Sequence, residues 1–231
     1  MTARTDWSGV RDRVVAAALA EQRARGWPPY PVPILAPVLT TDEIAEVEVQ
    51  FGVTLPEEYR SFLAQVGAGG HGPKFLLTTL REIAGSWGWF SEDDERFPFL
   101  LDASGPFIET DDWLDVQVAT LRTGGHEPTV RDEENDYHAD YLQAFGAEAG
   151  DELWRAQRNR GAIYISDNGG GITGWLIVAG PRRGEVRDRD CGFNPPFEPY
   201  VDAAGNRHTF RTWYLEWLEQ REAEFADHLA G

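Results

Sequence analysis

The stretch LTTDEIAEVEVQFGVTLPEEYRSFLAQVGAGGHGP, residues 39–73, contains the local signals that decide the fold. Thr40 and Glu43, three residues later, have the spacing of a capping box at the start of a helix. Apolar residues then recur at helical intervals until Gly52, which is expected to end the helix. Pro56 pre-sets the first turn of another helix, with two glutamates at its positive end, and we expect Gly67 to end it. This stretch therefore predicts two short helices packed as a hairpin.

The residues before this hairpin predict a helix followed by an extended connector. Residues 7–25 have a loose helical period of valines and alanines, which Gly26 and Pro28 end. Residues 27–37 contain five prolines, which favour an extended chain over regular structure. We therefore treat residues 1–35 as an N-terminal helical extension.

The residues after the hairpin predict strands and then a closing helix. A strand is expected over residues 74–79, and three more at Ala162–Asp167, Trp175–Ala179 and Glu185–Arg189. The turn Asn168-Gly169-Gly170-Gly171 and a Gly-Pro turn separate the last three, which indicates an antiparallel meander. A closing helix within residues 209–228 is predicted from apolar residues spaced three or four apart, namely Phe210, Trp213, Tyr214, Trp217, Leu218 and Phe225.

The composition and the order of elements together predict an α+β fold. The chain is expected to form a single domain, residues 1–231, whose antiparallel β-sheet is flanked by the helices around residues 41–66 and 209–228. Nine Trp, twelve Phe and seven Tyr supply enough apolar area for a sizeable core. The start of the chain does not have the pattern of a secretion signal, and no apolar run approaches the ~20 residues of a membrane span, so we expect a cytoplasmic protein.

Two further segments complete a resemblance to a known family. The run GAIYISDNGGGITGWLIVAGPRRGEVRDRD covers residues 161–190, and TFRTWYLEWLEQ covers residues 209–220. With the opening stretch, their order resembles the SUKH superfamily in its Smi/Knr-like branch, as a SUKH-like core over residues 39–80 and 161–220. The N-terminal extension and an acidic central elaboration, residues 82–152, are longer than that core needs.

The acidic elaboration contains most of the charge of the chain. Residues 82–152 hold nineteen Asp and Glu against three Arg, within a chain of net charge −18. Such a field repels nucleic acid and anionic membranes and steers a basic partner toward it, although an acidic surface can also serve only solubility. Any exposed tryptophan here would be an anchor, and the alternative is that each packs in the core. The expected partner-binding residues are Glu92, Asp93, Asp94, Glu95, Asp111, Asp112, Trp113, Asp132, Glu133, Glu134 and Asp136.

No catalytic or metal-binding pattern emerges from the sequence. The chain has no G-x-S-x-G elbow, H-E-x-x-H motif, phosphate loop or dinucleotide fingerprint, and Cys191 is its one cysteine. Asp132, Glu134 and Asp136 alternate like the start of a calcium loop that lacks its glycine and final glutamate. We therefore expect no catalytic residues, no metal and no cofactor. Adjacent carboxylates such as those of Asp111 and Asp112 keep a carboxylate-based hydrolase as the weakest alternative.

The resemblance implies a binding role. Many bacterial members of the superfamily are immunity proteins encoded beside polymorphic toxins, often nucleases, and fungal relatives act as regulatory scaffolds. We expect an immunity protein that is not an enzyme and that occludes a basic toxin domain by stoichiometric binding. A regulatory protein-interaction scaffold is the alternative. Nucleic acid, membrane and small-molecule substrates are not expected as partners.

Overall fold

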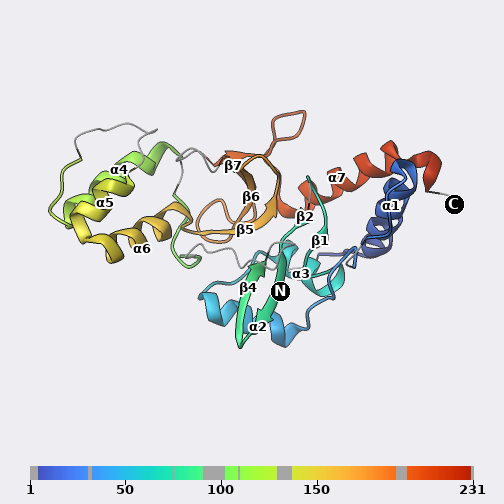
Figure 1. Cartoon of the computed structure of the whole chain (residues 1–231), viewed down its shortest axis with the longest axis horizontal. Coiled ribbons are helices and arrows are strands. Elements are labelled where there is room, and N and C mark those ends of the chain that lie inside the picture. Colours follow the sequence, from blue (N-terminus) through green and yellow to red (C-terminus); the bar gives the residue numbers. More distant parts are fainter. Residues whose placement is uncertain are drawn as a thin grey trace.

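The computed structural model describes residues 5–30, 33–74, 76–90, 102–108, 110–128, 137–190 and 197–229, without the side chains of residues 110 and 111 (Figure 1). Within these ranges the helices are α1 (Val10–Arg25), α2 (Thr41–Phe51), α3 (Glu57–Gln65), α4 (Thr110–Thr123), α5 (His138–Phe145), α6 (Ala147–Arg158), α7 (Phe210–Glu224) and the 3-10 turn η1 (Ala226–His228). The strands are β1 (Gly70–His71), β2 (Leu76–Leu77), β3 (Thr79–Ile83), β4 (Ser86–Phe90), β5 (Ala162–Asp167), β6 (Ile172–Ile177), β7 (Val186–Asp190) and β8 (Glu198–Pro199).

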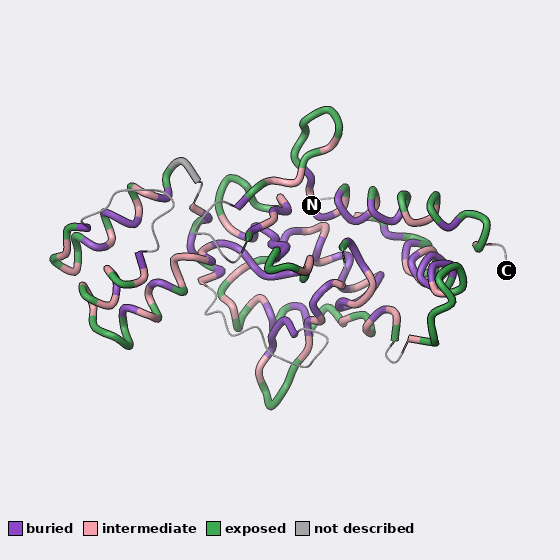
Figure 2. The backbone as a smooth tube through the Cα atoms, turned by 45° about the horizontal axis from the view of Figure 1, so that its top comes forward, coloured by how far each residue is buried: buried purple, intermediate pink, exposed green. Residues whose placement is uncertain are grey.

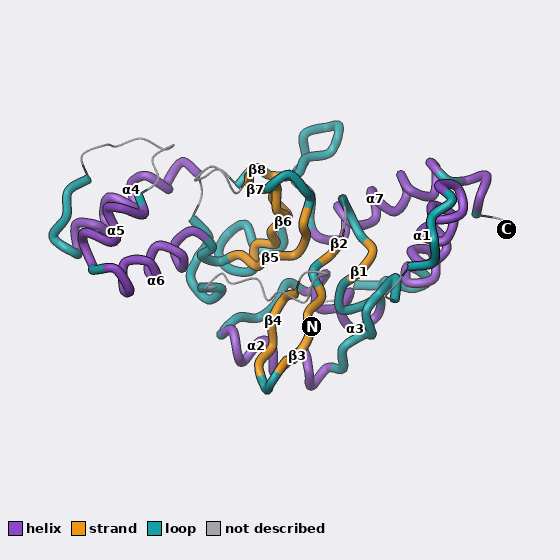
Figure 3. Tube along the Cα trace, viewed as in Figure 1, coloured by secondary structure: helices purple, strands orange, loops and turns teal. Residues whose placement is uncertain are grey.

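Six of these strands form one antiparallel sheet in the order β1-β2-β5-β6-β7-β8, and β3 pairs with β4 in a separate hairpin. This confirms the expected α+β class and the antiparallel meander, which is β5-β6-β7. Figure 3 shows the sheet near the centre of the molecule, with α2 and α3 on one side and α1 and α7 at one end.

The expected boundaries of two strands were wrong. Strand β6 begins at Ile172 instead of Trp175, because the turn after β5 is tight: the Ile172 amide donates to the Gly169 carbonyl at 3.0 Å. The strand predicted over residues 74–79 is divided into β2 and β3 at Thr78. The amide of Thr78 still donates to β5, at 2.9 Å from the Ile165 oxygen, whereas the next residue already pairs with β4.

The first helical hairpin forms largely as predicted. Thr40 and Glu43 make both hydrogen bonds of the capping box, and Gly52 ends α2 with a left-handed φ of 62°. The role expected of Gly67 was wrong, because α3 ends at Gln65 and Gly67 is not in the left-handed region. A Cβ at this position would lie 2.8 Å from the Ala36 carbonyl oxygen, so glycine is required there by the close approach of the connector.

The N-terminal extension is part of the main core. The Trp7 side chain is 2% exposed, and its indole Nε1 donates to Ser61 Oγ at 3.0 Å. Helix α1 packs along α7, where Arg13 Nη2 lies 2.6 Å from a carboxylate oxygen of Glu222. The extension therefore shares one hydrophobic core with the family-like segments.

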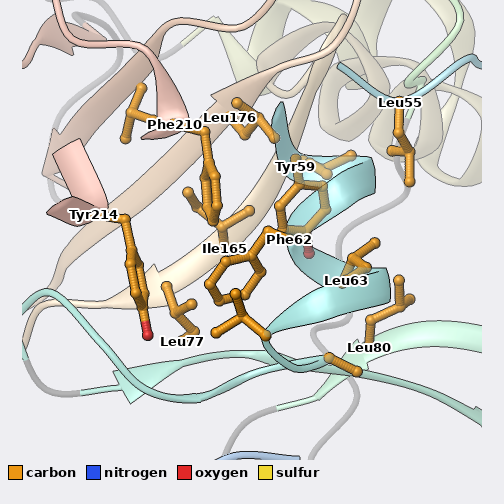
Figure 4. Packing of buried hydrophobic residues seen from close by; sticks show 14 of the residues in the cluster. Leu55, Tyr59, Phe62, Leu63, Leu77, Leu80, Ile165, Leu176, Phe210 and Tyr214 are labelled. Carbon is orange, nitrogen blue, oxygen red and sulfur yellow. The ribbon is translucent and has the colours of Figure 1, made fainter. Parts of the chain in front are cut away.

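The main core combines aromatic with aliphatic side chains, and Figure 4 shows Tyr59, Phe62 and Phe210 near one another within it. The ring of Phe62 on α3 is fully buried, with its centroid 5.1 Å from that of Phe210 and 4.8 Å from that of Tyr214 on α7. The aromatic face expected of the closing helix is buried against this core: Phe210, Trp213, Tyr214, Trp217 and Leu218.

Helices α4, α5 and α6 form a helical insertion with a core of its own, at the opposite end of the molecule from α1 (Figures 1 and 2). Its buried residues are Trp113, Leu121, Tyr137, Tyr141 and Trp154. The buried guanidinium of Arg189 on β7 joins it to the sheet, lying 4.7 Å from the Trp175 ring centroid and donating to the Arg158 carbonyl at 3.0 Å. The insertion is thus a packed helical body and not a loose acidic loop.

Candidate functional site

A groove of about 950 Å³ runs between the connector after α1 and the strands β1 to β3. The amide of Ala36 donates to the Gly69 carbonyl at 3.0 Å, and that of His71 to the Ile34 carbonyl at 2.7 Å, so the connector covers the edge of β1. The apolar part of the lining includes Ile34, Leu39, Leu77, Leu80, Trp87 and Trp217.

A cluster of charged groups closes the groove beside α1 and α7. The Glu21 carboxylate, on a side chain 8% exposed, lies 2.9 Å from Arg25 Nε and 3.7 Å from Arg221 Nη1. Both arginines also pair with Glu224, at 3.5 and 2.8 Å. Two carboxylates and two guanidinium groups therefore neutralise one another at this end.

His71 stands among these groups on β1. Its ring centroid is 6.0 Å from that of Tyr30 and 5.4 Å from that of Trp217, and its Nε2 is 3.7 Å from Glu21. Burial lowers the pKa of His71; the Glu21 charge opposes this shift and the Arg221 charge adds to it. The neutral imidazole is the form that the folded protein favours.

This burial predicts a pH-dependent stability. Because the folded protein holds the His71 pKa below its ordinary value of about 6.5, the unfolded chain takes up the proton first, and stability is lost as the pH falls below that value. We expect the wild type to lose more free energy of unfolding between about pH 7 and pH 5 than the His71→Gln variant. Denaturant unfolding across this range measures the difference. The exposed His228→Gln change is the control, and identical pH slopes for wild type and His71→Gln would contradict the expectation.

Sequence reasoning missed this groove. The sequence analysis singled out none of the five histidines, and it took Trp217 only as an apolar residue of the closing helix. The groove is assembled from α1, the connector, β1 to β3 and α7, whose residues lie as far apart in sequence as Glu21 and Arg221. The spacing of residues within one segment cannot predict a site that is built from several distant segments. The run of prolines beside aromatic residues at 27–37 was the one local signal that the connector, which forms one wall of the groove, would be irregular.

Most of the expected partner-binding residues lie outside the described part of the chain: Glu92, Asp93, Asp94, Glu95, Asp132, Glu133, Glu134 and Asp136. The backbone of Asp111 lies in α4, but its side chain is also outside the described part of the structure. Asp112 is exposed, as a binding role requires. Trp113 is 4% exposed and packs 6.1 Å from the Trp154 ring centroid, so it is a core residue of the insertion and not a surface anchor.

The helical insertion presents several carboxylates to solvent. Asp112 and Asp115 on α4, and Glu148 and Glu152 on α6, are exposed and make no hydrogen bond or ion pair with the described residues. Other acids here are paired, as in the contact of 2.8 Å between Arg122 and Glu127. These four carboxylates contribute to the negative charge that the composition places in residues 82–152.

The acidic residues of the insertion that the structure describes do not converge on a cation site. Asp140 pairs with His126 at 2.7 Å, and His138 pairs with Asp151 at 3.0 Å, so His138 and Asp140 face different partners. Across the described ranges, no group of three or more His, Cys, Asp or Glu side chains is placed to hold a metal ion. The calcium-like run 132–136 lies outside those ranges.

The glycine turn of the meander is held by a half-buried polar network. Asp188 on β7 accepts from the Tyr200 hydroxyl and from Asn168 Nδ2, both at 2.5 Å. Burial raises the pKa of Asp188, and the two hydrogen bonds oppose that shift. The Lys74 ammonium lies 5.6 Å from the Tyr200 ring centroid. Because the Asn168 side chain is fixed in this way, the network positions the start of the turn at residues 168–171.

Comparison with known protein families gives a match over most of the chain. Residues 38–186 match the family described as the SMI1 / KNR4 family (SUKH-1), a range that runs from the end of the connector to the first residue of β7 and includes the helical insertion. The closing helix α7 lies beyond it, as does α1. No curated protein and no solved structure matches the chain. No helix in the described ranges has the length and apolar character needed to cross a membrane.

Proposed function

The chain belongs to the SMI1 / KNR4 family (SUKH-1), and from this membership we propose that it is an immunity protein, which binds a toxic protein and blocks it by occlusion. Domains of this family are protein-interaction modules, so the partner is a protein. The finer proposal is that this partner is a basic toxin domain, such as a nuclease whose cleft is positively charged because it holds nucleic acid.

The observation that supports this proposal most directly is the acidic surface of the helical insertion. Its own core packs three helices together at one end of the molecule, and the carboxylates of Asp112, Asp115, Glu148 and Glu152 are exposed without a partner among the described residues. Like-charged groups on one packed body accelerate encounter with a basic surface and favour one orientation of docking. Covering the cleft of the toxin then excludes its substrate.

Co-expression in living cells tests the proposed function. The gene next to that of this chain would be expressed in a host that its product kills, with and without the chain, and we expect the chain to restore growth. An inactivated form of the toxin should copurify with the chain. If the neighbouring product is harmless or unbound, the immunity role is wrong. Copurification of a regulatory enzyme without any rescue would instead favour the scaffold role.

We also propose that the action requires no turnover. Titrating a fixed amount of toxin with purified chain should reduce toxin activity linearly to an endpoint near one chain per toxin molecule, because occlusion consumes one inhibitor for each target. Sub-stoichiometric inactivation that continues with time would indicate an enzyme. The Asp112→Asn variant would then show whether this carboxylate of the insertion takes part in catalysis, because neutralising an essential carboxylate abolishes turnover.

A further inference from the structure

Among the described residues, the edge of β3 that faces away from β4 has no backbone partner at Glu82. The backbone of Trp87 on β4 bonds the side chain of Gln50 through both its amide and its carbonyl, at 2.8 and 2.9 Å. Trp87 therefore forms a non-hydrogen-bonded pair with Glu82, whose own amide and carbonyl must point away from β4. Neither group bonds any described residue. Glu82 thus offers one donor and one acceptor on a strand edge.

Other edges near this point are covered by the protein itself. The Gln50 side chain occupies the outer edge of β4 by bonding the backbone of Trp87, and the connector pairs with β1 through Leu35 and Gly70. At Leu80, two residues before Glu82, the β3 amide is taken by the Ala68 carbonyl at 2.8 Å. The open part of the β3 edge therefore begins where this internal pairing stops, and Leu80, Arg81 and Glu82 all line the groove.

At the end of the groove beside the charged cluster of α1 and α7, three polar atoms also lack a hydrogen-bond partner among the described residues. Tyr30 Oη, His71 Nε2 and Trp217 Nε1 are buried without a hydrogen bond, and all three residues line the groove. The indole N–H can only donate, so it requires an acceptor such as a carbonyl oxygen. Because the charged cluster beside these residues is neutral overall, a neutral acceptor suits this end better than an anion or a cation.

The charge beside the open edge is acidic. Glu82 on the open edge and Glu43 on α2 both line the groove, and the Arg81 guanidinium lies over the Phe90 ring, 4.7 Å from its centroid. A basic side chain on the occupant complements these two carboxylates. Apolar walls, an open strand edge, unmet donors and an acidic end are together the features of a site for an extended polypeptide.

We infer that the groove binds an extended segment of a protein partner, which adds to β3 as a further strand. The segment pairs its backbone with Glu82, lays alternate apolar side chains on Leu77, Leu80 and Trp87, and places a lysine or arginine near Glu43. Its carbonyl groups at the far end supply acceptors for Trp217 and Tyr30. This interaction does not depend on the partner being a toxin, and it uses a surface other than the acidic insertion.

Titration of the full chain with the acetylated, amidated peptide VTVTVKK tests the inference. Calorimetry gives the Kd, and NMR spectroscopy follows the backbone amides of Leu80 and Glu82 and the indole signal of Trp217. We expect saturable binding that shifts all three signals. Methylating the peptide nitrogen that donates to the Glu82 carbonyl should weaken binding about tenfold, the loss of one backbone hydrogen bond. The peptide VTVTVEE should also bind more weakly.

A protein variant makes the same test from the other side. Glu82→Pro removes the free amide without breaking the β3–β4 ladder, whose bonds are made by the neighbouring residues, and it should also weaken VTVTVKK about tenfold. Glu82→Gln is the matched control, which alters only the charge, and unfolding curves confirm that both variants fold. If Glu82→Pro does not fold, the methylated peptide on the wild-type chain still decides. Equal affinity for the methylated peptide, equal or tighter binding of VTVTVEE, or no saturable binding would overturn the inference, while leaving the toxin experiments unaffected.

Discussion

Replacing Phe62 by Ala is expected to lower the free energy of unfolding by about 3 to 5 kcal/mol. The ring is fully buried, and it touches Trp7 from the N-terminal extension as well as Phe210 and Tyr214 from α7, with centroid distances of 5.3, 5.1 and 4.8 Å. Removing it leaves a cavity between three elements that cannot all move inward. Denaturant unfolding of the purified variant measures the loss.

The control for this prediction is Val49→Ala on α2. Val49 is 81% exposed, so its truncation should change stability by less than about 0.5 kcal/mol. Trp213→Ala, at a side chain 5% exposed on α7, should resemble Phe62→Ala. Unchanged unfolding combined with lost partner binding would place either aromatic residue in the interface instead of the core.

Neutralising the acidic surface of the helical insertion is expected to slow association with a basic toxin about tenfold at low salt. The variant carries Asp112→Asn, Asp115→Asn, Glu148→Gln and Glu152→Gln, four exposed carboxylates that stabilise no described contact. Exposed charges act over a Debye length of about 8 Å at physiological salt, so the variant should also depend less on salt. Dissociation should change much less. Stopped-flow measurements at two salt concentrations give the association rate and the dissociation rate of each protein.

A second variant with the same change in net charge separates local steering from total charge. It carries Asp12→Asn, Asp42→Asn, Glu219→Gln and Asp227→Asn, which are exposed and lie outside the insertion. Steering by the insertion requires this control to associate nearly as fast as the wild type. Equal slowing of both variants would show that only the total charge matters. Equal rates for all three proteins would exclude steering and move the interface to the groove or the glycine turn.

The expected binding residues show how far charge counting can go. The acidic elaboration was visible from composition alone, and the exposed side chain of Asp112 agrees with it. The burial of Trp113 was not predictable in the same way. A tryptophan beside two aspartates suits a surface anchor as well as the inner face of a helix, and its place was fixed only by Trp154 and Tyr141, which arrive from other helices.

Local signals determined the elements whose ends depend on residues a few positions apart. The capping box at Thr40, the left-handed Gly52 and the aromatic period of α7 each operate within about four residues, so the sequence by itself specified those helices and the order of the meander. It specified the amount and the approximate location of the negative charge for the same reason, because charge is a property of each residue wherever it lies.

Tertiary structure alone decided the features that depend on distant segments meeting. Gly67 is required by the approach of Ala36, the division of the predicted strand at Thr78 follows from its passage between two sheets, and the N-terminal helix joins the core through Trp7. The groove needs Glu21, Glu82 and Arg221 to come together. The free energy that places such groups comes from burying apolar area between segments, and no single segment contains that information.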